Sequence, residues 1–544
     1  MAWARAALAL IAAAAIGLVL VSGSSSVDPR TPAALPGEPP PFLGTAIAGG
    51  GKLTAAVDAY GDVVDLLAPG PAGESLIDNP SDRQTAGSVE AATGIRPRVR
   101  IGGGPWLAMW EADVVRQRYL PGTNVVRTAA KFGAVRVVTT VAALGSWLAV
   151  RIVVRGTAGS APSIGANLGD ELRCRRERRP GQADLLCGVD RPLRGAVAGR
   201  GEGTGQSDSS SVGAVIRAAA RADRGWLARA QALGAGAPRW GSEMYERSLL
   251  AMRALTDRGG GAVAAGARDG WAYVWPRDAA AVALALAAAG YRGEARRVAR
   301  FLAGLDLAAA ARFDGGGEPV GGRAAQGDAA GWAAAAAEAA GLSLPTQRLP
   351  WRDRGDYHEG APGDYLADAI AAGDLAAIRA GFETERGLVR RENDPGSGLD
   401  SAAAWAVRPF ALRSLHPAAE RTMQQLTEQR GRYGITPGES WRGGVDPWSA
   451  PTAWSAWGLA ALSREAGTDG RGRADRRAAL ALLGALRRSA TAAGALPERV
   501  DRRTGVPRST TPLAWSHAFA ALAVLELWPP DLSSSHGGAA GEAR

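Results

Sequence analysis

The hydrophobic and polar positions of the chain follow two different patterns, and the change falls near residue 222. Before it, short apolar runs such as residues 135–141 and 147–154 are broken by Gly, Pro, Asn and Asp. Alternation and β-branched residues at this spacing are typical of an antiparallel sandwich. We therefore predict an antiparallel β-sandwich domain over residues 43–221. It contains no recognisable set of catalytic residues.

After residue 222, longer Ala- and Leu-rich segments have helical periodicity, and the loops between them are rich in Gly, Pro, Asp and Trp. No convincing strand separates them. Many of the segments are Ala-rich on all sides, as expected for helices that pack on both neighbours in a double ring. We therefore predict an (α/α)6 barrel over residues 222–530. The predicted helices are 223–234, 241–257, 277–289, 293–304, 328–340, 364–371, 374–383, 400–413, 417–429, 451–466, 474–492 and 514–527.

The N-terminus has the pattern of a targeting segment. Arg5 precedes an apolar run over residues 6–21, and small residues follow it. The run is long for a signal peptide and slightly short for a spanning helix, so residues 1–25 are either a signal peptide or a membrane anchor. Both predict export, as a secreted or a membrane-anchored protein. We expect residues 26–42 to be a Pro-rich linker and residues 531–544 a disordered tail.

The chain has two cysteines, Cys174 and Cys187, separated by a polar, Arg-rich stretch. In an exported protein this pair predicts one hairpin disulfide, and the alternative is two unpaired thiols. The four histidines are scattered, which argues against a zinc site. Neither a nucleotide motif nor a metal motif is present, so we expect no cofactor. Loop carboxylates such as Asp394 and Asp446 leave a structural calcium site open.

The formal net charge of +10 does not indicate a nucleic-acid partner. The charge is almost all arginine, with Lys52 and Lys131 the only lysines, and the arginines are spread along the chain among Asp and Glu. A basic stripe interleaved with aromatic residues is missing. The densest run, residues 173–179, is predicted to be a solvated hairpin tip.

Tryptophans in the second half cluster with acids and arginines at predicted loop positions. The clusters are residues 271–278, 351–359, 438–448, 496–498 and 515–517. Aromatic faces together with charged, bidentate partners match the apolar faces and hydroxyl rims of pyranose rings. Cleavage of a glycosidic bond needs one protonated carboxyl group and one carboxylate. The pattern therefore predicts a carbohydrate site built from loops at one end of the barrel.

Several of these segments resemble glycoside hydrolase family 15, which holds glucoamylases, glucodextranases and related trehalose-cleaving enzymes. The resemblance lies in Tyr245 with the five residues after it, in residues 271–278, in residues 326–331 and in the closing segments 496–501 and 512–518. The β-rich half resembles the N-terminal β-sandwich of bacterial members. Together the resemblance covers nearly all of residues 43–528.

The resemblance implies roles for particular residues. Glu498 matches the catalytic base, Arg277 and Asp278 match the pair that holds the terminal glucose, and Trp275 lies beside them. Glu359 is the best match to the general acid. Glu439 is the second choice for the acid, although its motif is more typical of a substrate loop. Other substrate-binding positions are expected at Trp441, Trp448, Trp515 and His517.

The position before Glu359 departs from the family pattern, because His358 stands where Trp is common. An apolar neighbour helps to keep a carboxylic acid protonated, and a neutral His would do this less well. A protonated His would instead lower the pKa of the acid. Glu359 also has structural interpretations, namely a salt bridge to Arg352 or Arg354, or a charge at a helix N-terminus.

The function implied by the resemblance is an inverting exo-acting hydrolase that releases glucose from the non-reducing ends of α-glucosides. Inversion predicts roughly 6.5–9.5 Å between the two carboxyl groups, and retention about 5–5.5 Å. One alternative is a catalytically degenerate member that binds glycans. Another is a toroid-fold polysaccharide lyase, which would use Tyr, His or Arg. The expected partner is an oligosaccharide or polysaccharide; the linkage and the oligomeric state do not follow from the sequence.

Overall fold

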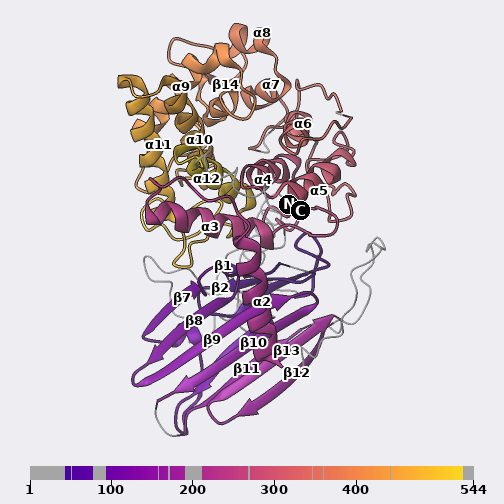
Figure 1. Ribbon diagram of the computed structural model, residues 1–544, viewed down its shortest axis with the longest axis vertical. Coiled ribbons are helices and arrows are strands. Elements are labelled where there is room, and N and C mark those ends of the chain that lie inside the picture. The colour runs from indigo at the N-terminus through magenta and orange to yellow at the C-terminus, as the bar shows by residue number, and fades with distance from the viewer. Residues whose placement is uncertain are drawn as a thin grey trace, which may run out of the picture.

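The computed structural model describes residues 43–50, 52–77, 94–156, 159–168, 172–189, 211–267, 270–345, 347–358, 361–441 and 443–530. Strands form its lower part and helices its upper part (Figure 1). The predicted targeting segment, the Pro-rich linker, the C-terminal tail and Glu359 lie outside these residues. Within the described ranges, no helix is both long enough and apolar enough to cross a membrane.

The strands of the first half form two antiparallel sheets. The first has the order β1-β2-β3-β5-β11, with β4 on β3 and β6 on β5, and the second has the order β12-β13-β10-β9-β8-β7. In β9, Val135 and Val137 are buried while Arg136 between them is exposed, which is the alternation of a strand with one face in the core. The bounds are β1 (Gly44–Ala48), β2 (Thr54–Asp58), β3 (Val63–Ala68), β4 (Glu74–Ser75), β5 (Gly94–Arg100), β6 (Trp106–Ala108), β7 (Val114–Tyr119), β8 (Val126–Phe132), β9 (Val135–Leu144), β10 (Trp147–Arg155), β11 (Ala161–Asn167), β12 (Leu172–Arg179) and β13 (Gln182–Val189).

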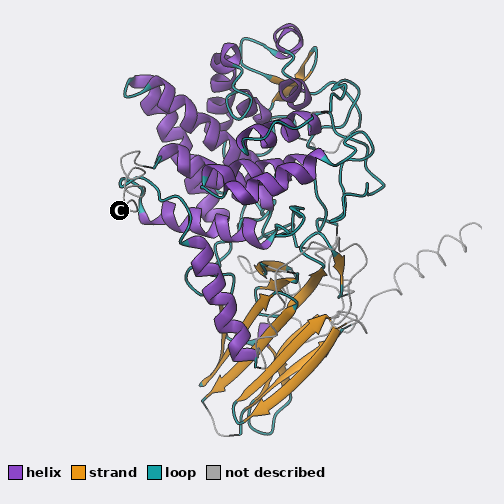
Figure 2. Cartoon of the chain, turned by 45° about the vertical axis from the view of Figure 1, so that its right-hand side comes forward, coloured by secondary structure: helices purple, strands orange, loops and turns teal. Residues whose placement is uncertain are grey.

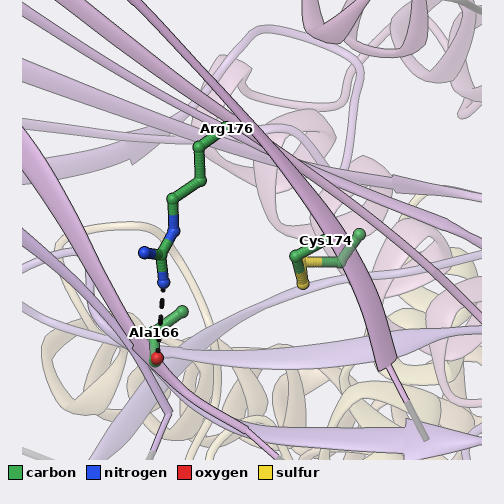
Figure 3. Close-up of a disulfide and its surroundings, with 4 residues drawn as sticks. Ala166, Cys174 and Arg176 are labelled. Carbon is green, nitrogen blue, oxygen red and sulfur yellow. Dashed lines mark hydrogen bonds between the residues drawn. A yellow bond between two sulfur atoms is a disulfide. The ribbon is translucent and has the colours of Figure 1, made fainter.

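The two cysteines pair across the hairpin of β12 and β13. Cys174 lies directly opposite Cys187 in the register, with 4.1 Å between the Cα atoms, and a disulfide joins them (Figure 3). The arginine-rich run 173–179 was predicted to be the tip of a hairpin, and this prediction is wrong. The run lies along β12, the edge strand of the second sheet. An extended edge strand can place its charged side chains in solvent, so the run needs no turn.

Helices make up most of the second half (Figure 2). Their bounds are α2 (Val212–Leu227), α3 (Arg239–Ala254), α4 (Pro276–Ala288), α5 (Arg292–Ala303), α6 (Ala329–Ala339), α7 (Leu366–Ala372), α8 (Leu375–Ala377), α9 (His416–Glu428), α10 (Ser449–Ala466), α11 (Gly470–Ser489) and α12 (Ala514–Leu527). A π-helical turn η3 (Ile378–Phe382) follows α8. The 3-10 segments are η2 (Met109–Glu111), η4 (Ser401–Ala406) and η5 (Arg413–Leu415).

Two segments differ from the prediction in their type of secondary structure. The segment 400–413 is not one helix: η4 ends at Ala406, and Pro409, which has no backbone N–H, follows soon after. A short hairpin of β14 (Val389–Arg391) and β15 (Asp394–Leu399) stands where no strand was expected. Its residues include Asn, Asp, Pro and Gly, which are typical of loops.

The helix α2 joins the two halves. Its side chains Val212 and Val215 pack on Ala149 of β10 and Leu186 of β13, and Figure 1 shows it lying across those strands. Its other end carries Trp226, whose ring stacks on that of Tyr291 just before α5, with 4.0 Å between centroids. The helix starts before and ends after residue 222, where the two predicted domains meet.

Candidate active site

The N-terminus of α4 carries two buried charged side chains. Trp275 precedes the helix and Pro276 occupies its first turn, where the missing N–H costs nothing. Arg277 is 2% exposed. It donates from Nη1 to Asp328 Oδ2 (2.8 Å) and to Gln326 Oε1 (3.0 Å). Its guanidinium lies 4.8 Å from the ring centroid of Trp515, so the side chain is fixed from several sides.

Glu498 lies in the loop between α11 and α12, and the backbone holds this loop in place. The N–H of Glu498 donates to the carbonyl of Thr510 (3.0 Å), and its own carbonyl accepts from the N–H of Ser449 (3.0 Å). The carboxylate accepts a short hydrogen bond from the Ser509 hydroxyl and a longer one from Trp271 Nε1 (3.4 Å). Both of its oxygens therefore have a donor.

The electrostatics place Glu498 and Asp278 in one site. Burial raises the pKa of Glu498, against the hydrogen bond from Ser509 and the charge of Arg499. Burial also raises the pKa of Asp278, to about 7; Arg277 opposes this shift and the charge of Glu498 adds to it. Burial, with a smaller contribution from the charge of Glu498, thus brings the pKa of Asp278 close to neutral pH.

His358 lies between two aromatic rings. Its ring centroid is 4.0 Å from that of Tyr357 and 4.3 Å from that of Trp441, both in edge-to-face geometry. The side chain is 2% exposed, and neither ring nitrogen makes a hydrogen bond within the described part of the chain. Burial lowers the pKa of His358 well below its usual value, and the charges of Arg390 and Arg277 act in the same direction. The imidazole is therefore neutral.

Two buried aspartates and one arginine surround this histidine. Asp356 accepts two hydrogen bonds from Arg390 (3.0 and 3.2 Å) and one from the His358 N–H (3.0 Å). Asp400 accepts from the Tyr357 hydroxyl (2.8 Å), and its Oδ2 lies 3.9 Å from His358 Nε2. Burial raises the pKa of Asp400 to about 6, although Arg390 opposes the shift. Glu359 follows His358 directly in the chain.

Comparison with known proteins places this geometry in context. Residues 240–308, which contain Trp275, Arg277 and Asp278, match the family model described as Glycosyl hydrolases family 15. The chain is similar to family 15 glycoside hydrolases. No curated protein sequence matches it. The family match covers the sugar-holding pair implied by the sequence but not Glu498.

A solved structure of a bacterial glucoamylase shares the fold. A bacterial glucoamylase in complex with acarbose superposes with a TM-score of 0.59 at 12% identity, over 91% of this chain and 95% of that chain. Glucoamylases from Saccharomycopsis fibuligera (14% identity, TM-score 0.43, 53% of this chain and 94% of that chain) and Hypocrea jecorina (14%, 0.41, 53% and 72%) are also similar. The predicted resemblance and the fold class, a β-sandwich followed by an (α/α)6 barrel, are confirmed, and the enzyme class is that of a glycoside hydrolase.

Glu439, the second choice for the acid, is held as an ion pair in this glucoamylase-like fold. Its carboxylate accepts from Arg386 (2.5 and 3.1 Å) and from Gln429 (2.9 Å). Burial alone would raise the pKa of Glu439, but these hydrogen bonds and one from the Leu399 N–H lower it. These partners stabilise the ionised carboxylate, whereas a general acid must stay protonated near neutral pH.

Two of the other predicted tryptophans connect His358 with the Glu498 loop. Trp441, which packs on His358, makes an edge-to-face contact with Trp448 at 5.5 Å. The backbone of Trp448 forms a bridge with that of Arg499, next to Glu498. Trp515 lies elsewhere: it is buried, and it packs between Arg277 and Trp454.

His517 is fully buried, and both of its ring nitrogens have partners. Nε2 accepts from the N–H of Leu496 (2.9 Å), so Nδ1 carries the proton and donates to Ser248 Oγ (3.0 Å). Burial lowers the pKa of His517 to about 3. Neither nitrogen is presented to a ligand, and the side chain holds the start of the loop that carries Glu498.

Sequence reasoning missed several residues of the site. Gln326 and Asp328, the partners of Arg277, stand in a segment that resembles the family, but no role was assigned to them. Ser509 and Arg390 carry no sequence signal, because an isolated Ser or Arg is common in loops.

Asp446, one of the two acids considered as calcium ligands, accepts a hydrogen bond from a backbone N–H (3.1 Å). No group of three or more potential metal ligands occurs among the described residues.

Proposed function

We propose that the chain is an inverting, exo-acting glycoside hydrolase that releases glucose from the non-reducing ends of α-glucosides. Glu498 acts as the general base and Glu359 as the general acid. The observation that carries the proposal is the environment of Glu498: a buried carboxylate, oriented by Ser509 and Trp271, beside the charged pair at the N-terminus of α4.

The base has to be ionised and aimed at a water molecule. The hydrogen bond from Ser509 and the charges of Arg499 and Arg323 favour the ionised form of Glu498, against the effect of burial. In the reaction, Glu498 takes a proton from water, the water oxygen forms a bond to the anomeric carbon, and the bond to the leaving oxygen breaks. Arg277 and Asp278 would hold hydroxyl groups of the terminal glucose, because they supply a fixed donor and an acceptor.

The acid has to carry a proton until the leaving oxygen takes it. The family places this group at Glu359, and the state of His358 supports that assignment. Because His358 is neutral, it adds no positive charge that would lower the pKa of the acid next to it. The positive charge of Arg390 is matched locally by Asp356 and Asp400, which lie 3.0 and 3.9 Å from it.

Glucose release is the test. Purified protein is incubated with maltooligosaccharides, isomaltooligosaccharides and trehalose, and the anomer of the released glucose is read by NMR. We expect β-glucose from an α-glucoside. We expect Glu498→Gln and Glu359→Gln to abolish release, while Glu428→Gln, an exposed carboxylate at the end of α9, leaves it unchanged.

Other results would contradict parts of the proposal. Release of α-glucose would mean retention, and glucose release that survives Glu498→Gln would overturn the assignment of Glu498 as the base. If wild-type protein releases no glucose but binds the oligosaccharides, the chain is a glycan-binding protein. Loss in Glu439→Gln but not in Glu359→Gln would move the acid to Glu439. Export is part of the proposal, and N-terminal sequencing of the mature protein tells a cleaved signal from an anchor.

A further inference from the structure

A cavity of about 520 Å³ lies between α2, the loop after α3, and α5. Its wall includes Leu286, which stands eight residues after Asp278 on α4. At 1.5 Å per residue, the two positions are about 12 Å apart along the helix. The cavity is therefore at the opposite end of α4 from the candidate active site. Its volume is in the range of small-molecule sites.

The wall of this cavity carries more positive than negative charge. Four arginines and two acids line it, so the formal charge of the lining side chains is 4 − 2 = +2. The residues are Arg229, Arg253, Arg258, Arg297, Asp257 and Glu294. Each guanidinium offers five N–H donors, so the wall holds many more donors than acceptors.

The two acids of the wall are already engaged. Glu294 accepts from Trp226 Nε1 (3.3 Å) and Arg229 (3.4 Å), and Arg297 lies 4.0 Å away. Asp257 accepts from two backbone N–H groups of its own turn. One carboxylate is thus shared by two arginines, and neither acid is paired with Arg258.

The other two arginines lie close to each other, and the charge of Asp223 acts on both of them. Arg253 is 7% exposed, lies 3.2 Å from Asp223 and covers the ring of Trp226. Arg258 makes no hydrogen bond, ion pair or ring contact with the described residues. Burial lowers the pKa of Arg253 to about 10, and the charge of Arg258 adds to this effect. Both remain cations at neutral pH, and a bound anion would offset their repulsion.

We propose that this cavity binds a phosphate or carboxylate group carried by a small sugar. The planar forks of Arg258, Arg229 and Arg297 match the oxygens of such a group in a bidentate manner. A bare oxyanion would fill only part of the volume. Glu294 and Asp257 also line the cavity, and their carboxylates keep acceptor capacity beyond the bonds above, which the hydroxyls of a sugar can use. The site is independent of the glycosidase function proposed above.

Isothermal titration tests the proposal with glucose 6-phosphate, glucuronate and inorganic phosphate as probes. The full chain is kept in saturating glucose, so that the candidate active site does not compete for the sugar ring. We expect at least one of the two sugar anions to bind more tightly than inorganic phosphate. Arg258→Ala should weaken that binding about tenfold or more, because one charge-assisted contact is lost. The tighter sugar anion identifies the group as phosphate or carboxylate.

Arg239→Ala is the matched control. Arg239 lies on α3, its side chain is 93% exposed, and it is not part of the cavity wall. This variant should bind the probes as the wild type does. Equal affinity of wild type and Arg258→Ala would overturn the location, as would an equal loss in Arg239→Ala. Equal affinity for inorganic phosphate would overturn the role of the sugar, and a failure of all probes to bind would overturn the site.

Discussion

Replacing Ser509 by Ala should shift the pH dependence of catalysis. The Ser509 hydroxyl donates to one oxygen of Glu498, and it favours the ionised carboxylate. A hydrogen bond to a charged group contributes about 1.5–3 kcal/mol. At 1.36 kcal/mol per pKa unit, its loss should raise the pKa of Glu498 by roughly one to two units.

The direction of the shift follows from the role of Glu498 as base. The base acts in its ionised form, so a higher pKa moves the acid limb of the kcat/KM profile to higher pH. Below both pKa values the variant should be about 10- to 100-fold slower than the wild type, and at higher pH the two rates should converge. The profile is measured with maltose or a chromogenic α-glucoside across the acid and neutral range.

Ser463→Ala provides the control for this prediction. Ser463 donates a buried hydrogen bond to the carbonyl of Gly472, and it stands 14 residues after Ser449, which contacts the Glu498 loop. On a helix that is about 21 Å away. The control should lose some stability without moving the acid limb. An acid limb that stays in place in Ser509→Ala would refute the assignment of Glu498 as the base that Ser509 orients.

Stability measurements test three further features. Between pH 6.5 and about 3 the imidazole of His517 binds a proton only in the unfolded chain, so the free energy of unfolding should fall with pH by at most about 5 kcal/mol. His517→Gln should flatten this part of the plot of melting temperature against pH, and an unchanged slope would contradict the prediction. Trp332→Ala should cost about 3–5 kcal/mol in denaturant unfolding, since the ring is fully buried, whereas exposed Trp147→Ala should cost less than about 1 kcal/mol. Replacing Cys174 and Cys187 by Ser should cost up to about 3 kcal/mol, and full stability of that variant would show that the bridge adds nothing.

The parts of the fold with a strong local signal could be predicted from the sequence. Helix α12 has the bounds that its apolar pattern predicts, and α4 begins one residue before the predicted start, at Pro276. The start of α2 was missed, because its first residues are Val, Gly and Ala, which continue the pattern of the strands before it. The hairpin of β14 and β15 was missed because its strands are built from residues typical of turns.

The candidate site was predictable where motif and position coincide. Arg277, Asp278 and Glu498 come from segments far apart in the sequence, and the family resemblance brings them together. His517 shows the limit of this reasoning. Its position close to Trp515, in a segment that resembles the family, predicts that His517 binds sugar, whereas in the structure its ring accepts a hydrogen bond from the Leu496 N–H. The direction of a side chain on a helix that is buried all round has no signature in the sequence.

Helix α2 has a consequence for how the molecule can be taken apart. One end of the helix forms a small hydrophobic cluster with the second sheet, and at the other end Trp226 stacks on Tyr291 of the barrel. A chain cut at residue 222 would leave each fragment with an apolar surface that its counterpart used to cover. Neither fragment is then a self-sufficient folding unit. Swapping the sandwich or the barrel between related proteins should succeed only when the whole of Val212–Leu227 travels with matching surfaces on both sides.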